Sequence, residues 1–401
     1  MKVLLQFVRI LVGVLFIFSG LVKANDPLGL SYKMQEFFEI WGWHGLNDWT
    51  LLSSVLMNAF EIIAGFALLV GWRIRMFSWL LLLLIIFFTY LTGYTYFTGK
   101  PKNCGCFGDC LPITSQTSFL KDVVLLILLA YIFYYRNKIT PLFRSGLNTS
   151  LMLLVTILSF GMQWYALRYG PFVDCLPYRK GNNIAEKMKM PANAIQDSID
   201  IYFVYEKQGK KVEFTADKFP ADFNDSLYTY VDRVDKVVKE GSNNVPPITG
   251  FALTTADGVD STGYVLQDKY AVLLFAEART AAAKDWAADF KKVYELARQK
   301  NIPVYIATSS YTELKQQLTE QGLQNIPLFN FDNTAFRTAA RTNPALYVLN
   351  EGTIVNKWSG KRMEQAVSVL EPLAALPAPV VVPVVPDTLN TSTDSLPPVQ
   401  P

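Results

Sequence analysis

The chain of 401 residues has little histidine, cysteine or charge, and each shortage excludes a class of protein. The single histidine, His44, excludes a centre with several histidine ligands and any mechanism with two catalytic histidines. Charged residues make up 18% of the chain, against roughly 25% in an average soluble protein. The net charge of +3 does not suggest a nucleic-acid partner, and the apolar content of 51% excludes a mostly disordered chain.

Long apolar runs are concentrated in the first 170 residues. A bilayer core about 30 Å thick requires about 20 mostly apolar residues in a helix. Five segments joined by short loops meet this requirement, which argues against buried helices of a soluble protein. They are about Val3–Val22, Trp49–Val70, Met76–Phe97, Phe119–Tyr135 and Leu151–Leu167. The sequence therefore predicts a helical bundle in contact with the lipid bilayer.

Lys and Arg in the short loops predict the orientation, because cytoplasmic loops carry an excess of them. With a cytoplasmic N-terminus, the inner positions are Lys2, Arg73, Arg75, Arg136, Lys138 and Arg144, with Arg9 reaching the inner interface. The outer loops hold Lys23, Lys33, Lys100, Lys102 and Lys121, spread over more residues, while Arg168, Arg179 and Lys180 count against this assignment. We expect a multi-pass protein of the inner (cytoplasmic) membrane whose second half is periplasmic or extracellular. The first segment also has features of a cleavable signal peptide, but its length and the four later spans favour retention.

After Gly170-Pro171 the composition becomes that of a soluble protein. The pattern predicts strands at 201–205, 212–215, 270–276, 302–308, 345–349 and 353–358, and helices at 226–240, 284–300 and 311–321. Strands that alternate with helices and end in a hairpin indicate an α/β layer fold. Residues 371–401 are rich in proline without periodicity, which predicts a disordered or extended tail.

Two stretches of the second half resemble the thioredoxin-like family. Residues 250–260 (GFALTTADGVD) resemble the lead-in of redoxin domains, and residues 342–355 (TNPALYVLNEGTIV) resemble the cis-proline strand and closing hairpin of that fold. The resemblance covers about residues 246–362 and implies that Pro344 is cis, which is uncommon for an X–Pro bond. It also implies a redox dithiol near Ala278–Ala283, where this chain has no Cys. Because disulfide exchange requires a thiolate, we expect a domain kept for binding or docking.

All four cysteines lie in two short outer segments. Cys104, Cys106 and Cys110 occupy the loop between the third and fourth spans, and Cys175 follows the fifth span. Three interpretations remain open: redox-active thiols, structural disulfides that tie the loop to the exit of the fifth span, or a zinc site of four thiolates. The Cys-x-Cys-x3-Cys spacing is not the usual zinc pattern, so we assign no metal ligands. Four cysteines allow three pairings, and spacing does not choose among them.

The first half resembles the DoxX/MauE-like family of four-helix membrane proteins over about residues 1–140. The resemblance rests on Arg9, on residues 18–23 (FSGLVK), 61–65 (EIIAG) and 104–108 (CGCFG), and on Lys121-Asp122. It implies a membrane redox or maturation role: DoxX-type members are linked to quinone electron transfer, and MauE-type members to methylamine dehydrogenase maturation beside a thioredoxin-like partner. A quinone is therefore the cofactor that the resemblance implies. The fifth span and the thiol-free domain depart from the family pattern.

Charged residues inside the spans are candidates for function, because a charge in the bilayer costs several kcal/mol unless it is paired or hydrated. Glu61 is expected near the middle of the second span, and Asp122 near the outer end of the fourth. A structural pair of Glu61 with Arg9 or Lys23 is one interpretation. A proton path or a contact to a quinone headgroup is the other.

These observations predict a four-helix DoxX/MauE-like domain (1–140), a fifth span (141–170), a juxtamembrane α/β segment with a hairpin (171–245), a thioredoxin-like domain without its dithiol (246–370) and a tail (371–401). The predicted function is a thiol-disulfide or quinone-linked redox module on the periplasmic face. Its candidate site residues are Cys104, Cys106, Cys110, Cys175, Glu61 and Asp122, and its partner a protein with redox thiols. The alternative is a non-enzymatic assembly factor whose thiol-free domain binds a periplasmic client.

Overall fold

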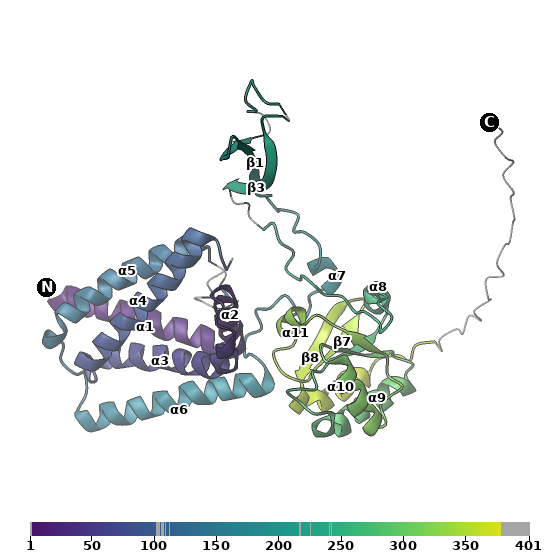
Figure 1. Ribbon diagram of the computed structural model, residues 1–401. Helices are drawn as coiled ribbons and strands as arrows, with labels where there is room; N and C mark the ends of the chain where they lie inside the picture. The colour runs from purple at the N-terminus through teal and green to yellow at the C-terminus, as the bar shows by residue number, and fades with distance from the viewer. Residues whose placement is uncertain are drawn as a thin grey trace.

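The computed structural model describes residues 2–101, 105, 108, 110–111, 113–215, 218–224, 226–239, 241 and 243–377. Three parts are distinct in Figure 1: a bundle of long helices, a small three-stranded sheet, and an α/β domain. The candidate site residues Cys104 and Cys106 lie outside the described residues, as does most of the predicted tail.

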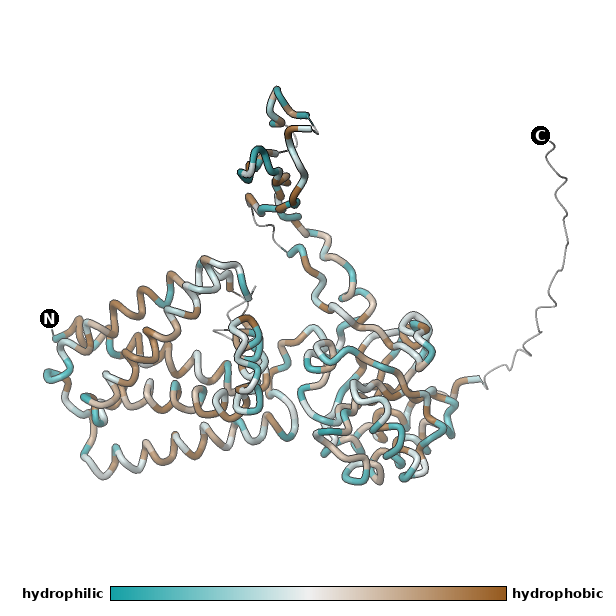
Figure 2. Tube along the Cα trace, viewed as in Figure 1, coloured by the Kyte–Doolittle hydropathy of each residue, from teal (hydrophilic) through white to brown (hydrophobic). Residues whose placement is uncertain are grey.

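The bundle contains five long helices, and the five predicted spans are confirmed as helices. They are α1 (Lys2–Asn25), α3 (Thr50–Val70), α4 (Ile74–Thr98), α5 (Ser115–Tyr134) and α6 (Ser145–Tyr169). Within the described residues these five are long and apolar enough to cross a membrane, and Figure 2 shows the long helices coloured largely as hydrophobic. The chain is therefore a multi-pass membrane protein.

Helix α1 packs closely against α3 through glycines. A Cβ on Gly13 would meet the Leu69 side chain at 2.6 Å, and one on Gly65 would meet the Gly13 carbonyl oxygen at 2.8 Å. Small residues let membrane helices approach closely where there is no hydrophobic drive between them. One turn before Gly13, Arg9 donates to the carbonyl oxygen of Leu69 at 3.1 Å. The first helix is thus part of the packed bundle.

Helix α2 (Pro27–Ile40) between the first two spans was not predicted. Asp26 caps it by accepting from the Gly29 amide at 3.2 Å, and Pro27 opens it, as favoured at helix starts. Its apolar residues Leu30, Met34 and Phe37 recur at helical spacing, so it lies with one face on the bundle. The turns η1 (His44–Trp49) and η2 (Arg136–Lys138) complete the membrane part.

The α/β domain has one five-stranded sheet in the order β6-β5-β4-β7-β8. Its strands are β4 (Ala271–Phe275), β5 (Val304–Thr308), β6 (Leu328–Asn330), β7 (Ala345–Asn350) and β8 (Thr353–Ser359). The three strands β4, β5 and β6 run parallel, and β7 and β8 form the antiparallel closing hairpin. The Asn343–Pro344 bond is cis. The predicted thioredoxin-like fold is therefore confirmed.

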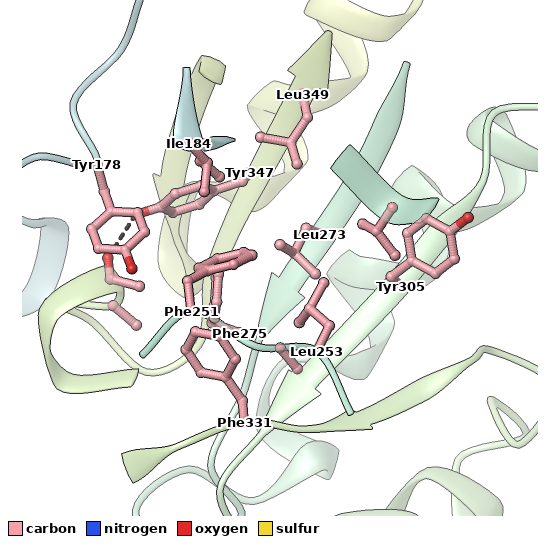
Figure 3. Close-up of a cluster of buried hydrophobic side chains, with 14 of the residues drawn as sticks. Tyr178, Ile184, Phe251, Leu253, Leu273, Phe275, Tyr305, Phe331, Tyr347 and Leu349 are labelled. Carbon is pink, nitrogen blue, oxygen red and sulfur yellow. Dashed lines mark hydrogen bonds between the residues drawn. The ribbon is translucent and has the colours of Figure 1, made fainter. Parts of the chain in front are cut away.

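Helices cover both faces of this sheet: α8 (Thr262–Gln267), α9 (Ala287–Gln299), α10 (Tyr311–Glu320), α11 (Asn333–Ala339) and α12 (Ala366–Leu370), with the turns η3 (Ala283–Asp285) and η4 (Gly360–Gln365). One buried cluster centres on Phe275 and Tyr347, and a second on Phe290 and Leu274. Figure 3 shows that Tyr178, from the chain before the short helix α7 (Ile184–Lys187), points into the first cluster. The segment that leaves the membrane is thus anchored in this domain.

The three-stranded sheet contains β1 (Ser198–Lys207), β2 (Lys210–Thr215) and β3 (Thr229–Lys239), in the order β2-β1-β3. The predicted hairpin is present, but the helix predicted at Ser226–Glu240 is wrong, because this segment forms β3. Valines three residues apart, at 231, 234 and 237, gave a helical pattern. Antiparallel pairing with β1 overrides that pattern. The pairing contains two register shifts, which are typical of β-bulges.

Candidate functional site

A disulfide joins Cys110 of the α4–α5 loop to Cys175 beyond α6, with an S–S distance of 1.94 Å. It ties together two segments 65 residues apart, as in the structural-disulfide interpretation. A site of four thiolates is not available in this structure, because two of the sulfurs are bonded to each other. Cys104 and Cys106 lie outside the described residues, so their pairing stays a prediction.

Asn25, the last residue of α1, holds the segment that carries this disulfide. Its side-chain amide donates to the carbonyl oxygen of Val173 at 2.8 Å, and its side-chain oxygen accepts from the amide of Val173 at 2.9 Å. The same amide lies 3.9 Å from Cys110 Sγ. Cys110 and Cys175 are both partly exposed, so the disulfide is accessible at the surface of the protein.

Inside the bundle, Glu61 and Lys23 form a buried ion pair. Their side chains are 1% and 3% exposed. Lys23 Nζ also lies 4.8 Å from the centre of the Phe88 ring, whereas Glu61 Oε2 has no hydrogen-bond partner among the described residues. Of the two predicted pairs, the structure contains Glu61–Lys23, and Arg9 contacts backbone carbonyls instead.

The second predicted carboxylate, Asp122, lies on the same small cavity as this pair. The cavity measures about 40 Å³, and Lys23, Glu61, Lys121 and Asp122 all line it. Asp122 accepts from Thr92 Oγ1 at 3.0 Å and pairs with Lys121 at 2.8 Å. Because one water needs roughly 10–15 Å³ of such volume, the cavity has room for two or three waters. The two carboxylates are thus brought together in a space suited to water and protons.

A larger apolar pocket of about 230 Å³ lies next to this cavity. Lys23 and Phe88 line both spaces, so they form the wall between them. The aromatic and aliphatic lining comes from α2, α3 and α4: Leu30, Met34, Phe37, Phe38, Trp41, Met57, Phe87 and Leu91. Gly105, which lies between Cys104 and Cys106 in sequence, also lines the pocket, against the stem of Lys33.

The sequence did not predict this pocket, because most of its outer wall belongs to the unpredicted helix α2. The recurrence of Leu30, Met34, Phe37 and Trp41 at three- and four-residue spacing was the available signal.

In the thioredoxin-like domain, hydrogen bonds hold the turn at the position where the resemblance implies a dithiol. The Asn343 side chain accepts from the Glu277 amide at 2.9 Å and donates to the Glu277 carbonyl oxygen at 2.6 Å. It also donates to Thr280 Oγ1 at 2.6 Å. An asparagine before the cis-proline therefore fastens the 277–280 turn, and no Cys follows Cys175 in the sequence. This domain has no thiol of its own for disulfide exchange.

The cis-proline side of this domain docks on the membrane part. Arg341 Nε contacts Asp26 Oδ2 at 2.8 Å, and Arg337 donates to Gln35 at 2.6 Å, with both guanidinium groups 5.3 Å from the Tyr32 ring. We call these contacts the docking seam, together with the ion pair of Lys357 and Asp174 at 2.6 Å. Burial lowers the pKa of Lys357, and the neighbouring Asp174 carboxylate partly opposes this. Asp174 directly precedes Cys175, so the seam adjoins the disulfide.

Arg341→Ala is expected to loosen the docking seam. Removing one partner of a desolvated interface pair costs about 2–5 kcal/mol, because the other charge keeps the cost of its burial and loses the cation that offset it. Hydrogen exchange should then become faster in α2 and in residues 337–344, while the sheet β4–β8 keeps its protection. Arg279→Ala is the matched control, since that side chain is 70% exposed and lies off the seam. Equal protection in both variants would contradict the docking seam.

Parts of the chain are similar to known proteins. Residues 1–135 match the family model described as methylamine utilisation protein MauE, and residues 199–240 match a domain of unknown function (DUF8463). Protein TlpB of Flavobacterium psychrophilum is 29% identical over 141 residues, 33% of this chain. The chain spans only 36% of that relative's length. A domain of a possible thiol-disulfide isomerase from Cytophaga hutchinsonii is 16% identical, with a TM-score of 0.25, and covers 30% of this chain and 92% of that domain.

Proposed function

With residues 1–135 a MauE-like membrane domain joined in one chain to a thioredoxin-like domain, we propose that this protein is a membrane thiol-disulfide redox module. The observation that carries the proposal is the partly exposed Cys110–Cys175 disulfide, whose Cys110 belongs to the same loop as Cys104 and Cys106. The orientation that we propose places all four sulfurs on the periplasmic face of the inner membrane, where disulfides persist.

In the proposed reaction, a periplasmic protein with two thiols reduces the Cys110–Cys175 disulfide. One thiolate of that partner attacks a sulfur, a mixed disulfide forms, and the second thiol resolves it, so the partner leaves with a disulfide and this chain gains two thiols. Exchange with a disulfide between Cys104 and Cys106 then restores Cys110–Cys175. Each exchange moves two electrons and leaves the number of disulfides unchanged. The electrons thus arrive at Cys104 and Cys106. These two residues flank Gly105 in sequence, and Gly105 lines the apolar pocket.

The apolar pocket fits a quinone ring, the acceptor class that we propose. A cavity of about 150 Å³ is enough to admit benzene, and this pocket measures about 230 Å³. Aromatic residues Phe37, Trp41 and Phe88 would hold the ring, and the ammonium groups of Lys23 and Lys33 would bind its oxygens. A bound quinone supplies the capacity to accept two electrons and two protons. Lys23 would hold a proton beside the pocket, and Glu61 and the small cavity lie behind it.

The function is tested with the full chain in liposomes. Reduced dithiol peptide is supplied outside with a short-chain benzoquinone, and quinol formation is followed by its absorbance. We expect turnover by the parent chain and a loss of about a hundredfold or more in Cys106→Ser, because the thiolate is the nucleophile. Equal rates in the two chains would reject the redox function and favour the assembly-factor alternative.

The alternative is supported by the thiol-free domain, whose cis-proline side docks beside Cys175. In that function the domain binds a periplasmic client, and the disulfide only joins the α4–α5 loop to the segment after α6. Crosslinking from the outer surface of the domain would then recover one recurrent client in Cys106→Ser as readily as in the parent chain.

Met57→Trp is expected to weaken binding of a short-chain benzoquinone about tenfold or more, because the indole ring would occupy volume in the pocket that the quinone ring needs. Binding is measured by equilibrium dialysis with the solubilised full chain. Met76→Trp is the matched control, because Met76 is 43% exposed on the surface of α4. Equal affinity in both variants would reject this pocket as the quinone site and would not bear on the proposed thiol exchange.

A further inference from the structure

Strand β3 leaves one long edge of the small sheet open. It pairs with β1 along one side, and among the described residues no strand pairs with its other side. The sheet stands apart from the bundle and from the α/β domain at the end of two extended segments (Figure 1). An exposed edge strand of this length presents free N–H and C=O groups to another strand.

The outward backbone groups can be assigned from the ladder. Val234 is paired with Tyr202, and the amide of Arg233 donates to the Asp232 carboxylate at 2.7 Å instead of to β1. Because hydrogen-bonded and non-hydrogen-bonded pairs alternate in an antiparallel ladder, Arg233 and Asp235 direct their backbone groups to the open edge. The ladder is regular from Asp232 to Val237, with register shifts on both sides of that stretch.

The charges on this regular stretch are self-complementary about Val234. In antiparallel pairing centred on Val234, Arg233 lies opposite Asp235 of a second copy, and Asp232 opposite Lys236 of that copy. Opposed residues share a face of the sheet, so each pair is a favourable cross-strand contact, and twofold symmetry makes each pair twice. A slip by one residue places Asp232 opposite Asp235, or Arg233 opposite Lys236, which is repulsive. The charges therefore specify one register.

We propose that two copies of this chain associate through β3, with a twofold axis at Val234, into one continuous sheet. Each copy contributes a non-hydrogen-bonded Val234 and hydrogen-bonded Arg233 and Asp235. The ion pair that Arg233 and Asp235 make within each strand at 2.7 Å is exchanged for a pair between copies, so two pairs within strands become two pairs across the axis. Stable soluble interfaces bury roughly 1,200 Å² or more, and a regular stretch of six residues is a short contact by comparison. Anchoring in one membrane offsets this by raising the effective concentration.

The register is tested by disulfide crosslinking of the full chain in native membranes. In Val234→Cys the two Cα atoms would lie about 4.5 Å apart, within the range that a disulfide bridges. In Val231→Cys the two introduced sulfurs would lie several residues apart on opposite strands. We expect crosslinked dimer from Val234→Cys, about tenfold less from Val231→Cys, and none above background from the parent chain with its native cysteines. Val231 is 39% exposed and Val234 only half-buried, so random collision predicts the reverse order and would overturn the proposal.

Charge reversal separates contacts between copies from contacts within a copy. In the Val234→Cys chain, Arg233→Asp alone and Asp235→Arg alone should each lower crosslinking about tenfold, because like charges then oppose each other. Co-expression of the two variants with tags of different size should restore the mixed dimer. Each variant keeps its repulsive pair within the strand, so restoration can only come from the contact between copies. Failure of the mixed dimer to form, or crosslinking of Val234→Cys to a different protein, would reject the proposal.

Discussion

Replacing Cys104 and Cys106 together by Ser is expected to change Cys110–Cys175 in cells from mainly oxidised to mainly reduced. In the proposed function these two thiols carry electrons away from that disulfide, so their loss leaves electrons from the periplasmic partner on Cys110 and Cys175. A tenfold change in the oxidised-to-reduced ratio corresponds to about 30 mV for a two-electron couple. We expect at least that change, read by alkylating free thiols in intact cells and separating the forms on gels.

Asn103→Ser is the matched control for this experiment, since it changes the same loop and keeps both sulfurs. The Cys110–Cys175 disulfide should stay oxidised in that variant. If it also stays oxidised after both cysteines are replaced, the bond is a structural tie and the redox function fails. A chain that unfolds would lose the Asn25–Val173 hydrogen bonds as well, and faster hydrogen exchange at the exit of α6 reports this separately.

Lys23→Met is expected to destabilise the membrane bundle by about 3–5 kcal/mol, because it leaves the Glu61 carboxylate buried without a partner. The double variant Lys23→Met with Glu61→Gln should recover most of that loss, since no uncompensated charge remains. Unfolding of the solubilised chain measures both. Lys33→Met is the matched control, because its partner Glu36 is 44% exposed and stays hydrated, so its loss should cost less.

The same double variant distinguishes the two interpretations of the buried pair. If Lys23 and Glu61 only stabilise the bundle, the stable double variant keeps its rate of quinol formation. If they hold protons beside the apolar pocket, the rate falls even though the fold is restored. A normal rate in a stable double variant would leave the pair a purely structural role.

The spans were predictable because length and apolar content alone decide whether a helix crosses a bilayer. The strands β4 and β5 were predictable because short, fully apolar runs alternate with amphipathic helices. The thiol-free character of the thioredoxin-like domain is a property of the sequence itself. In each case the local residues carry the whole signal.

Other features depend on contacts that no local pattern contains. Strand β3 resembles a helix in the spacing of its valines, and only its partner β1 decides otherwise. Glu61 and Asp122 were separate candidates, and helix packing brought them to one cavity. The pairing of Cys110 with Cys175 was one of several that the spacing allowed. Helix α2, which builds the outer wall of the pocket, has only one apolar face and no long run.

The C-terminal end of α1 limits how this chain can change in evolution. Within four residues, Lys23 reaches Glu61 in the bilayer, Asn25 holds the segment of the disulfide, and Asp26 binds the α/β domain. Successive residues of a helix differ by about 100° in direction and 1.5 Å in height. One inserted or deleted residue before Lys23 would therefore turn all three side chains away together. A single substitution in this segment should remove one of the three contacts, whereas a change in its length should remove all three.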